Sequence, residues 1–282
     1  MNILIIGSKG QVGASLVQQA EENKILYSAT DRTILDVTNE AAIQAYFEKN
    51  NVFDFVINAT AYTNVDGAED DETTANAVNH FGVHYLALAC KHYNIPLIHI
   101  STDYVFDGEK LTDYSEDDFP NPQNVYGQSK LAGEIALQSI WEKHIILRVS
   151  WVFSEFGKNF VKTIANLCDQ KEKLGVIANQ YGSPTSARSI AKVLIEICRN
   201  NNNAWGVYHY SDFPATNWHQ LATHVARIKG KDTKIDAIEE KDYPLRAKRP
   251  KNSRFCNHKI KKVFGIEQGF WMAEVERILP TH

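Results

Sequence analysis

Short apolar runs alternate with amphipathic stretches along the first 150 residues of the chain. This alternation is typical of a parallel sheet whose strands are joined by crossover helices. The near-continuous Ile, Val, Leu and Phe content of the runs indicates strands that are covered on both faces. We predict strands at residues 3–6, 25–29, 53–58, 97–101 and 145–149, and helices at roughly 11–22, 40–50, 74–93 and 125–142.

The pattern loosens after about residue 150, where Pro184, Pro214, Pro244 and Pro250 separate shorter segments. We therefore expect an α/β protein made of two parts. Residues 1–150 are predicted to form a Rossmann-type doubly wound parallel sheet, completed by about 187–210. Residues 151–282 are predicted to form mainly a smaller, mixed C-terminal domain that closes over the carboxyl edge of the sheet.

The composition is that of an ordinary globular chain. Of its 282 residues, 44% are hydrophobic and 23% charged, and the formal net charge is −4. A weakly acidic chain offers no electrostatic reason to bind nucleic acid or an anionic membrane, so we expect neither as a partner.

Cysteine usage and the N-terminal sequence both indicate a cytoplasmic protein. Cys90, Cys168, Cys198 and Cys256 are far apart and form no CxxC pair, so we interpret them as small apolar residues in a reducing compartment. Only four apolar residues precede the first glycine loop, and no run approaches 18 apolar residues.

A glycine-rich turn, Gly7-Ser8-Lys9-Gly10-Gln11-Val12-Gly13, directly follows the first predicted strand and opens a helix. Glycines there permit a tight turn and a close approach of the backbone to a pyrophosphate, which the helix N-terminus also attracts. Asp31 follows Gly13 by 18 residues and ends the second strand, where a carboxylate accepts from a ribose hydroxyl. The pattern predicts a dinucleotide site.

The choice between NADH and NADPH stays open at this point. The Asp31 carboxylate would repel a 2′-phosphate, which favours NADH. Arg32, the next residue, would offset that repulsion.

The next two strands deliver small and polar residues to the same edge. The third ends in Asn58-Ala59-Thr60-Ala61-Tyr62-Thr63, whose small residues allow a flat cofactor to lie against the backbone. The fourth ends in Ser101-Thr102-Asp103, which places a hydroxyl and a carboxylate there.

Tyr126 and Lys130 are four residues apart on a predicted helix and therefore share one face. Roughly one such Tyr-x-x-x-Lys pair is expected by chance, so the pair gains meaning only from its context. That context favours hydride transfer to a ketone, in which the new alkoxide needs a proton. Tyr126 would donate the proton, and the Lys130 ammonium, together with the positive nicotinamide of the oxidised cofactor, would lower its pKa. Lys130 would also hold the nicotinamide ribose. Thr102 would hydrogen-bond the carbonyl oxygen.

Eight motifs occur in order across residues 1–254: GSKGQVG, Asp31, NATAYTNVD, STDYVF, YGQSK, RVSWVF, NQYGSPT and RPKNS. Together they resemble the extended short-chain dehydrogenase/reductase superfamily, and within it the reductases of nucleotide-linked 4-keto sugars. The resemblance implies that NADH or NADPH reduces the 4-keto group of a dTDP-linked substrate, dTDP-4-dehydro-L-rhamnose. Residues 1–150 would then bind NAD(P) and residues 151–282 mainly the substrate.

The same resemblance implies roles for individual residues. Tyr126, Lys130 and Thr102 would be catalytic. Thr102, Asp103, Trp151 and Asn252 would contact the nucleotide sugar, with Asn252 and its basic neighbours near the diphosphate. In addition to Gly7, Gly13, Tyr126 and Lys130, the residues contacting the cofactor would be Gly10, Gln11, Val12, Asp31, Asp36, Val37, Ala61, Tyr62 and Thr63.

Departures from related patterns narrow the expectation. Related dehydratases have a glutamate where this chain has Tyr104, which favours a simple reductase. Some relatives hold magnesium at a dimer contact with glutamates, at positions where this chain has Ser15 and Arg188, so we predict no metal. The chain is expected to be a monomer or a homodimer.

Other interpretations remain open. One alternative is that the protein reduces another nucleotide 4-keto-6-deoxy sugar. A second is that it is a non-catalytic NADP-binding regulatory subunit of S-adenosylmethionine synthetase. Trp151 would alternatively be a core residue, because large aromatic residues after a strand usually pack inside.

Overall fold

The apolar runs form a parallel sheet in the computed structural model, which describes residues 1–200 and 202–279. All five strand pairings are parallel. Across the sheet the strands are β10 (Gly206–Tyr210), β5 (His144–Val149), β4 (Leu97–Thr102), β3 (Phe55–Asn58), β1 (Asn2–Ile6) and β2 (Leu26–Thr30). The five predicted strands are confirmed, each within two residues at either end.

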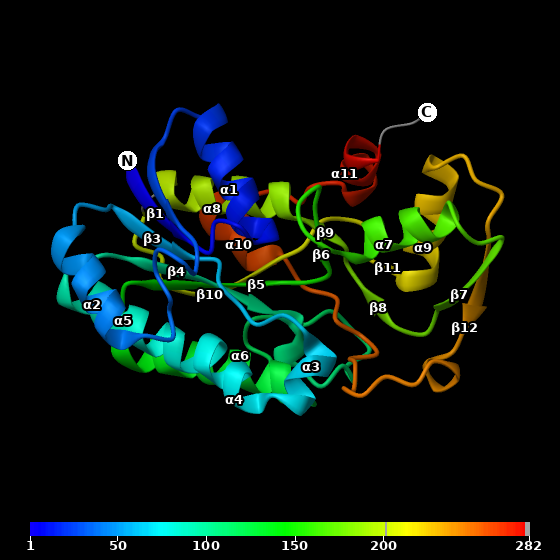
Figure 1. The fold of residues 1–282 in the computed structure, drawn as a ribbon, viewed down its shortest axis with the longest axis horizontal. Coiled ribbons are helices and arrows are strands. Elements are labelled where there is room, and N and C mark those ends of the chain that lie inside the picture. The colour runs from blue at the N-terminus through cyan, green and yellow to red at the C-terminus, as the bar shows by residue number, and fades with distance from the viewer. Residues whose placement is uncertain (201, 280–282) are drawn as a thin grey trace.

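Helices cover both faces of the sheet (Figure 1). On one face lie α1 (Gln11–Glu22), α8 (Ala187–Asn200) and α10 (His258–Phe264). On the other lie α2 (Glu40–Lys49), α5 (Gly82–His92) and α6 (Val125–Ile140). This doubly wound arrangement confirms the predicted fold class.

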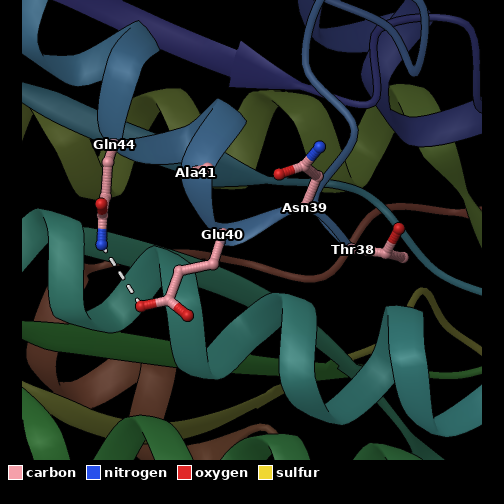
Figure 2. A pocket seen from close by; sticks show the side chains of 5 residues that line it. All are labelled: Thr38, Asn39, Glu40, Ala41 and Gln44. Carbon is pink, nitrogen blue, oxygen red and sulfur yellow. Dashed lines mark hydrogen bonds between the residues drawn. The ribbon is translucent and has the colours of Figure 1, made fainter.

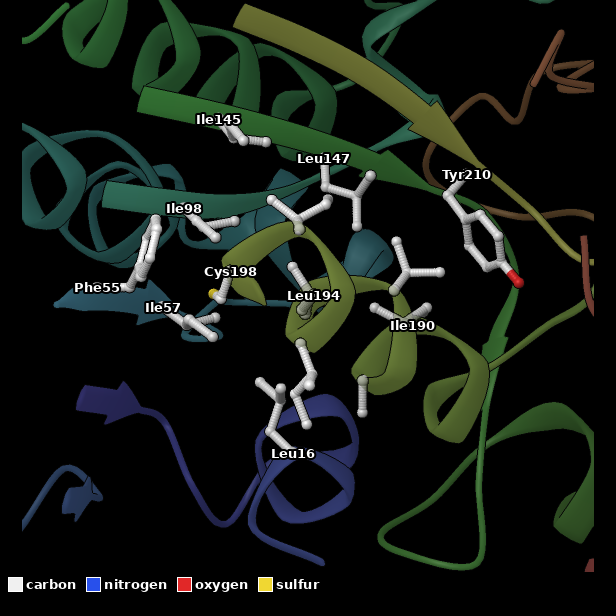
Figure 3. Packing of buried hydrophobic residues seen from close by; sticks show 14 of the residues in the cluster. Leu16, Phe55, Ile57, Ile98, Ile145, Leu147, Ile190, Leu194, Cys198 and Tyr210 are labelled. Atoms are coloured by element: carbon white, nitrogen blue, oxygen red, sulfur yellow. The ribbon is translucent and has the colours of Figure 1, made fainter. Parts of the chain in front are cut away.

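Alternate strand residues fill two separate cores. In β1, Ile3 and Ile5 pack toward α1 and α8, while Leu4 and Ile6 pack toward α2 and α5. Figure 3 shows the first core, in which α8 and α1 lie side by side against the strands. Because every strand residue is covered on one side or the other, a parallel sheet needs the near-continuous apolar runs seen in the sequence.

The predicted helix at 74–93 is instead three successive segments. These are α4 (Glu72–Asn76), the π-helical turn η1 (Ala77–Phe81) and α5. A short helix, α3 (Val65–Asp70), precedes them. A π turn inserts one extra residue into a helix, which rotates the side chains that follow. Apolar periodicity across the segment does not reveal that insertion.

A second lobe with its own core lies beyond the carboxyl edge of the sheet (Figure 1). Its helices are α7 (Phe160–Cys168), α9 (Trp218–Ile228) and α11 (Trp271–Ile278). A parallel strand pair, β7 (Lys173–Ile177) and β12 (Lys234–Ile238), packs beside them.

Short strands complete the structure. They are β6 (Val152–Phe153), which pairs with β9 (Thr185–Ser186), and β8 (Tyr181–Gly182), which pairs with β11 (Thr216–Asn217). Two single 3₁₀ turns are η2 (Asp103–Val105) and η3 (Glu240–Asp242).

The segment at 187–210 contributes α8 and β10, and β10 pairs with β5 at one edge of the sheet. Helix α10, near the C-terminus, also packs on this face. Across residues 1–200 and 202–279, no helix is both long and apolar enough to cross a membrane.

A buried ion pair attaches α6 to the sheet. Arg148 of β5 donates from Nε to Glu134 Oε1 at 2.9 Å and from Nη2 to Oε2 at 2.6 Å. Both side chains are nearly inaccessible, at 4% and 1% exposure. Two parallel hydrogen bonds between buried charges fix both the position and the rotation of the helix.

We predict that Arg148→Met lowers the free energy of unfolding by about 3–5 kcal/mol, because it leaves the Glu134 charge buried without its partner. Denaturant unfolding measures this value. The double variant Arg148→Met/Glu134→Leu should recover much of the loss, since it removes both charges.

The matched control is Arg199→Met on the surface of α8, whose pair with Glu196 is 43% and 55% exposed. Its loss should stay within about 1 kcal/mol. Equal losses for Arg148→Met and Arg199→Met would contradict the prediction.

Candidate active site

The glycine turn lies between β1 and α1 and adopts a conformation that requires glycine at two positions. Gly7 has φ of 88°, in the region that only glycine adopts readily. Its N–H and that of Ser8 donate to Thr30 O of β2, at 2.8 and 2.9 Å. At Gly13, an added methyl group would overlap the carbonyl of Gly7. The turn therefore holds the start of α1 tightly against the ends of β1 and β2.

The N-terminus of α1 has no side-chain cap and no acidic residue in its first turn. Six other helices have a side-chain cap, from Asn39, Asn64, Asp71, Asn124, Asn159 and Asn217. The first N–H groups of a helix need acceptors, and a phosphate group supplies them. The geometry of this turn therefore fits the pyrophosphate of a dinucleotide.

Asp31 follows β2, but its carboxylate already has partners. Lys9 from the glycine turn forms an ion pair with it, and Thr33 donates from both N and Oγ1, at 2.8 and 2.6 Å. The Lys9 ammonium, followed by the Thr33 donors, holds the pKa of Asp31 well below its usual range. Lys9 itself is 78% exposed. A cation in the glycine turn thus neutralises the carboxylate that was predicted to meet the ribose.

Asp36 and Arg32 form the neighbouring pair, with Nε donating to Oδ2 at 3.2 Å. Burial acts to raise the pKa of Asp36, but hydrogen bonds from Thr38 and the Arg32 charge leave it lowered. Val37 is buried in the core beneath α2, and Val12 packs half-buried on the opposite core. Gln11 Oε1 accepts from Ser154 and Asn159 of the second lobe, both at 3.0 Å.

Figure 2 shows a hollow that begins two residues after Asp36, at the first turn of α2. Thr38, Asn39, Glu40, Ala41 and Gln44 line it. None of the predicted catalytic residues belongs to this set, so the hollow is separate from the site of proton transfer.

The loop after β3 is attached to α6 through one buried asparagine that the sequence pattern did not reveal. Asn79 lies in η1; its Oδ1 accepts from Tyr62 N at 2.8 Å and its Nδ2 donates to Tyr62 O at 3.1 Å. The same Nδ2 lies 3.0 Å from the Ser129 hydroxyl of α6. Ala61 and Thr63, on either side of Tyr62, are exposed. The π turn thus places Asn79 where it shapes the predicted cofactor loop.

Tyr126, Lys130 and Thr102 meet at the carboxyl end of β4. Asn124 caps α6 by accepting from Gly127 N at 2.8 Å, which starts the helix just before Tyr126. The three side chains are almost fully buried. Burial raises the pKa of Tyr126 to about 12, while the neighbouring Thr102 hydroxyl lowers it and the Asp103 charge raises it. In the chain alone the phenol is therefore a weaker acid than a free tyrosine. The lowering expected from Lys130 together with the oxidised nicotinamide concerns the loaded site and stays a prediction.

Lys130 points into the protein, away from solvent. Its Nζ donates to Ile100 O at 2.7 Å and lies 3.1 Å from His99 Nε2. Burial lowers the pKa of Lys130 to about 8, and the Glu134 charge opposes that shift. Neither His99 nor its partner Asn58 was predicted as a site residue, although Asn58 ends β3 and His99 lies within β4, three residues before Thr102.

Asp103 and Trp151, the other predicted sugar contacts, both lie beside Ser253, whose hydroxyl approaches Asp103 and shares with Trp151 the space beside Gly182. We call this the second corner of the candidate site. Burial raises the pKa of Asp103 to about 6, against the lowering effect of the Ser253 and Thr102 hydroxyls. Asp103 Oδ2 and Ser253 Oγ are buried and make no well-oriented hydrogen bond within residues 1–200 and 202–279. Buried polar atoms of this kind suit a polar ligand.

Trp151 is half-buried, with φ of 48°, and stacks face to face on Trp218 of α9. The ring centroids are 3.5 Å apart and the planes differ by 7°. A methyl group at Gly182 would overlap the Trp151 ring, so β8 also lies directly against it. Trp151 thus joins the end of β5 to the second lobe rather than packing in the sheet core.

The basic segment 246–254 is largely paired with acidic side chains. Arg249 donates to both Asp66 oxygens at 3.0 and 2.7 Å, and Arg246 contacts Asp70. Asn252 donates from Nδ2 to Lys110 O and Thr112 O, at 2.7 and 2.9 Å. The segment therefore binds α3 and the loop after β4 together, and the predicted substrate contact of Asn252 stays a prediction.

A groove of about 530 Å³ opens beside this segment. It is lined by Gly108, Glu109, Lys110, Leu111, Asn179, Tyr181, Lys251, Asn252 and Arg254. Its lining combines three cations with one aromatic ring.

Ser15 and Arg188, the two positions on which the prediction of no metal rests, form internal contacts. Ser15 donates to Gln11 O at 3.0 Å, and Arg188 pairs with Glu22 at 3.2 Å. Within the described part of the chain, no three His, Cys, Asp or Glu side chains gather as a metal would require.

Comparison with known proteins places this geometry in a family. The family model described as RmlD substrate binding domain matches residues 1–282. The dTDP-4-dehydrorhamnose reductase of Aggregatibacter actinomycetemcomitans is 39% identical to this chain, over 98% of this chain and 97% of that protein. The chain belongs to the dTDP-4-dehydrorhamnose reductase family.

Solved structures of dTDP-4-dehydrorhamnose reductases agree with this assignment. The enzyme of Clostridium acetobutylicum has a TM-score of 0.94 and 33% identity, over 99% of this chain and 98% of that chain. The enzyme of Bacillus anthracis, solved in complex with NADP, has a TM-score of 0.93 and 30% identity, over 98% of each chain. The resemblance inferred from the eight motifs is confirmed, and the protein is an oxidoreductase of the dTDP-4-dehydrorhamnose reductase family.

The close packing of the glycine turn generates a prediction. Gly13→Ala should lower the free energy of unfolding by roughly 1–3 kcal/mol, because the new methyl group forces α1 away from Gly7. Thermal or denaturant unfolding measures the loss. At Gly10 an added methyl group would lie 3.4 Å from Gly7 O, an ordinary contact, so Gly10→Ala is the matched control. A loss at Gly13 no larger than at Gly10 would contradict this account.

Proposed function

We propose that this protein reduces the 4-keto group of dTDP-4-dehydro-L-rhamnose to give dTDP-L-rhamnose, with NADPH or NADH as reductant. The observation that carries the proposal is that the Tyr126 phenol lies beside the Thr102 hydroxyl at the carboxyl end of β4, with Lys130 one turn further along α6 and bound to Ile100 O of the same strand. The uncapped N-terminus of α1 lies at the same edge of the sheet. Membership of the reductase family supports it.

The dinucleotide, when bound, supplies the hydride. Thr102 then donates a hydrogen bond to the ketone oxygen, where negative charge develops. Tyr126 gives its proton to that oxygen, and Lys130 holds the ribose beside it. Asp103 and Trp151 contact the sugar from the second corner. Burial of these groups excludes water, which strengthens each of these interactions.

The groove beside Asn252 is the proposed place for the dTDP side of the substrate. Lys110, Lys251 and Arg254 line it, paired with Asp118, Glu109 and Asp113 at 2.6, 3.8 and 3.4 Å. On this proposal the phosphate oxygens compete with these carboxylates for the three cations. The Tyr181 ring, 49% exposed, offers a surface on which a base can stack. This placement keeps the diphosphate on the basic segment and the sugar near Asp103.

The same proposal assigns dinucleotide binding and substrate binding to two parts of the chain. Residues 1–150, with 187–210, bind the dinucleotide, and the remainder of 151–282 mainly binds the substrate. The residues assigned to the cofactor are Gly7, Gly10, Gln11, Val12, Gly13, Asp31, Asp36, Val37, Ala61, Tyr62 and Thr63. We also propose a cytoplasmic location, as a monomer or a homodimer.

Tyr126→Phe tests the mechanism. Removing the proton donor should reduce kcat by about 10²–10⁴-fold with little change in KM, because the phenol acts on the developing alkoxide. Oxidation of NADPH with dTDP-4-dehydro-L-rhamnose is the measurement. A loss of less than tenfold would refute Tyr126 as the donor. The wild-type protein should be assayed in parallel with GDP- and UDP-linked 4-keto sugars, since a binding-only regulatory subunit would turn over none of them.

Lys9 sets the preference between the two cofactors on this proposal. Without Lys9 the Asp31 charge is no longer neutralised, so it repels the 2′-phosphate of NADP⁺ more strongly. Lys9→Ala should weaken NADP⁺ binding on the order of tenfold, equivalent to about 1.4 kcal/mol, and leave NAD⁺ affinity within about threefold. Titration of protein fluorescence gives both constants.

The control is Lys49→Ala at the C-terminal end of α2, which removes the same charge from the opposite edge of the sheet. An equal loss of NADP⁺ affinity in the Lys49 variant would show that only net charge matters. Equal losses for NADP⁺ and NAD⁺ in the Lys9 variant would rule out a role in discrimination.

A further inference from the structure

A row of buried polar side chains runs from β3 through β4 to Lys130 on α6. Asn58 Nδ2 lies 3.1 Å from His99 Nδ1, and His99 Nε2 lies 3.1 Å from Lys130 Nζ. Lys130 Nζ also donates to Ile100 O at 2.7 Å. Asn58 and His99 are fully buried and Lys130 is 1% exposed. Because water does not reach the row, each N–H in it needs a protein acceptor.

The orientation of the Asn58 amide is fixed by the loop that follows it. Asn58 Oδ1 accepts from Thr60 N at 3.0 Å and from Thr60 Oγ1 at 2.6 Å. Rotating the amide by half a turn would set its NH₂ against the backbone N–H of Thr60. The NH₂ group of Asn58 therefore faces His99, and His99 Nδ1 is the acceptor.

A neutral imidazole has one N–H, so accepting at Nδ1 places that hydrogen on Nε2. His99 Nε2–H then points at Lys130 Nζ. An ammonium group has only donors, and a charged Lys130 would set two donors against each other. A neutral amine accepts from His99 and still donates to Ile100 O, so that no two donors of the row face each other.

Burial acts in the same direction as this hydrogen-bond pattern. It lowers the pKa of Lys130 to about 8 and, together with the Lys130 charge, holds the pKa of His99 well below its usual value. An imidazolium at His99 has an N–H on each ring nitrogen. Its Nδ1–H would face the Asn58 NH₂ group, which is itself a donor, so this contact also opposes the charged form of His99.

The charged groups around Lys130 do not reverse this balance. On α6 itself, Glu134 raises the pKa of Lys130, but two hydrogen bonds tie Glu134 to Arg148 of β5. Asp103, after β4, acts on the Tyr126 phenol. The titratable group on η1 is His80, whose ring stacks on Phe81 with centroids 4.5 Å apart.

We propose that His99, oriented by Asn58, is a positioning residue that favours the neutral amine of Lys130 in the cofactor-free protein. Lys130 then takes up one proton from solvent when it turns from His99 to the cofactor ribose. The first statement concerns the chain alone, and the second rests on the proposed function.

The tautomer of His99 is the first test. Nitrogen NMR of histidine-labelled, cofactor-free protein at pH 9, above the pKa of Lys130, should show His99 protonated at Nε2 and not at Nδ1, with the signal identified by its loss in His99→Gln. Asn58→Asp keeps both acceptor contacts to Thr60 but turns the group facing His99 into an acceptor. That variant should move the hydrogen to Nδ1, so that Nε2 accepts from a charged Lys130.

Proton uptake is the second test. Calorimetry of NADP⁺ binding at pH 9, in two buffers of different ionisation enthalpy, should show close to one proton taken up per site in the wild type. Uptake should fall close to zero in Asn58→Asp and in Lys130→Met. Thr60→Val is the matched control: its backbone N–H still orients Asn58, so uptake should persist.

The possible results separate the two proposals. His99 protonated at Nδ1 in the wild type, or NADP⁺ binding without proton uptake at pH 9, would overturn the role of His99 and leave the proposed function intact. Uptake that is unchanged in Asn58→Asp would also overturn it. A failure to bind either NADP⁺ or NAD⁺ would count against the proposed function, while the NMR result would still decide the state of the row.

Discussion

The seating of α6 against the carboxyl ends of β4 and β5 is the constraint on which the site depends. At Gly127 and Gly133 a side chain would overlap the carbonyls of Tyr104 and Asn79, so the helix backbone lies directly on its neighbours. The buried pair of Arg148 and Glu134 fixes the same helix from the side of the sheet. Because Tyr126 and Lys130 both project from α6, any shift of this helix would displace the proton donor and the ribose-binding amine together.

Local patterns were sufficient to predict the elements that carry the site. The helix expected at 11–22 has these bounds in the structure, and the one expected at 125–142 ends two residues earlier. Both begin at a recognisable signal, the glycine turn in one case and the Asn124 cap in the other. Strands buried on both faces also leave a strong local signal, so the order of strands and helices identified the fold class.

Contacts between distant residues left no such signal. Asp66 and Arg249 are 183 residues apart, and the basic stretch alone gave no indication that α3 would neutralise it. The face-to-face stack of Trp151 on Trp218 joins two lobes, whereas the sequence offered only a sugar contact or a core position. Asn79 was hidden inside an apparently continuous helix, because a π turn changes the phase of a helix without changing its composition.

The ionisation of the catalytic groups was the least predictable feature, because it follows from burial rather than from spacing. Tyr126 and Lys130 are four residues apart, which suggested that the ammonium, together with the positive nicotinamide of the oxidised cofactor, would lower the pKa of the phenol. In the folded chain, burial raises the pKa of Tyr126 to about 12 and lowers that of Lys130 to about 8. Between these values both groups are neutral, so neither desolvated side chain carries a charge that the fold must compensate. The chain alone therefore does not set the acidity of Tyr126 that proton transfer needs. The charges that lower the pKa of the phenol must therefore come from the bound ligands. Tyr126 then has a lowered pKa only when the site is loaded.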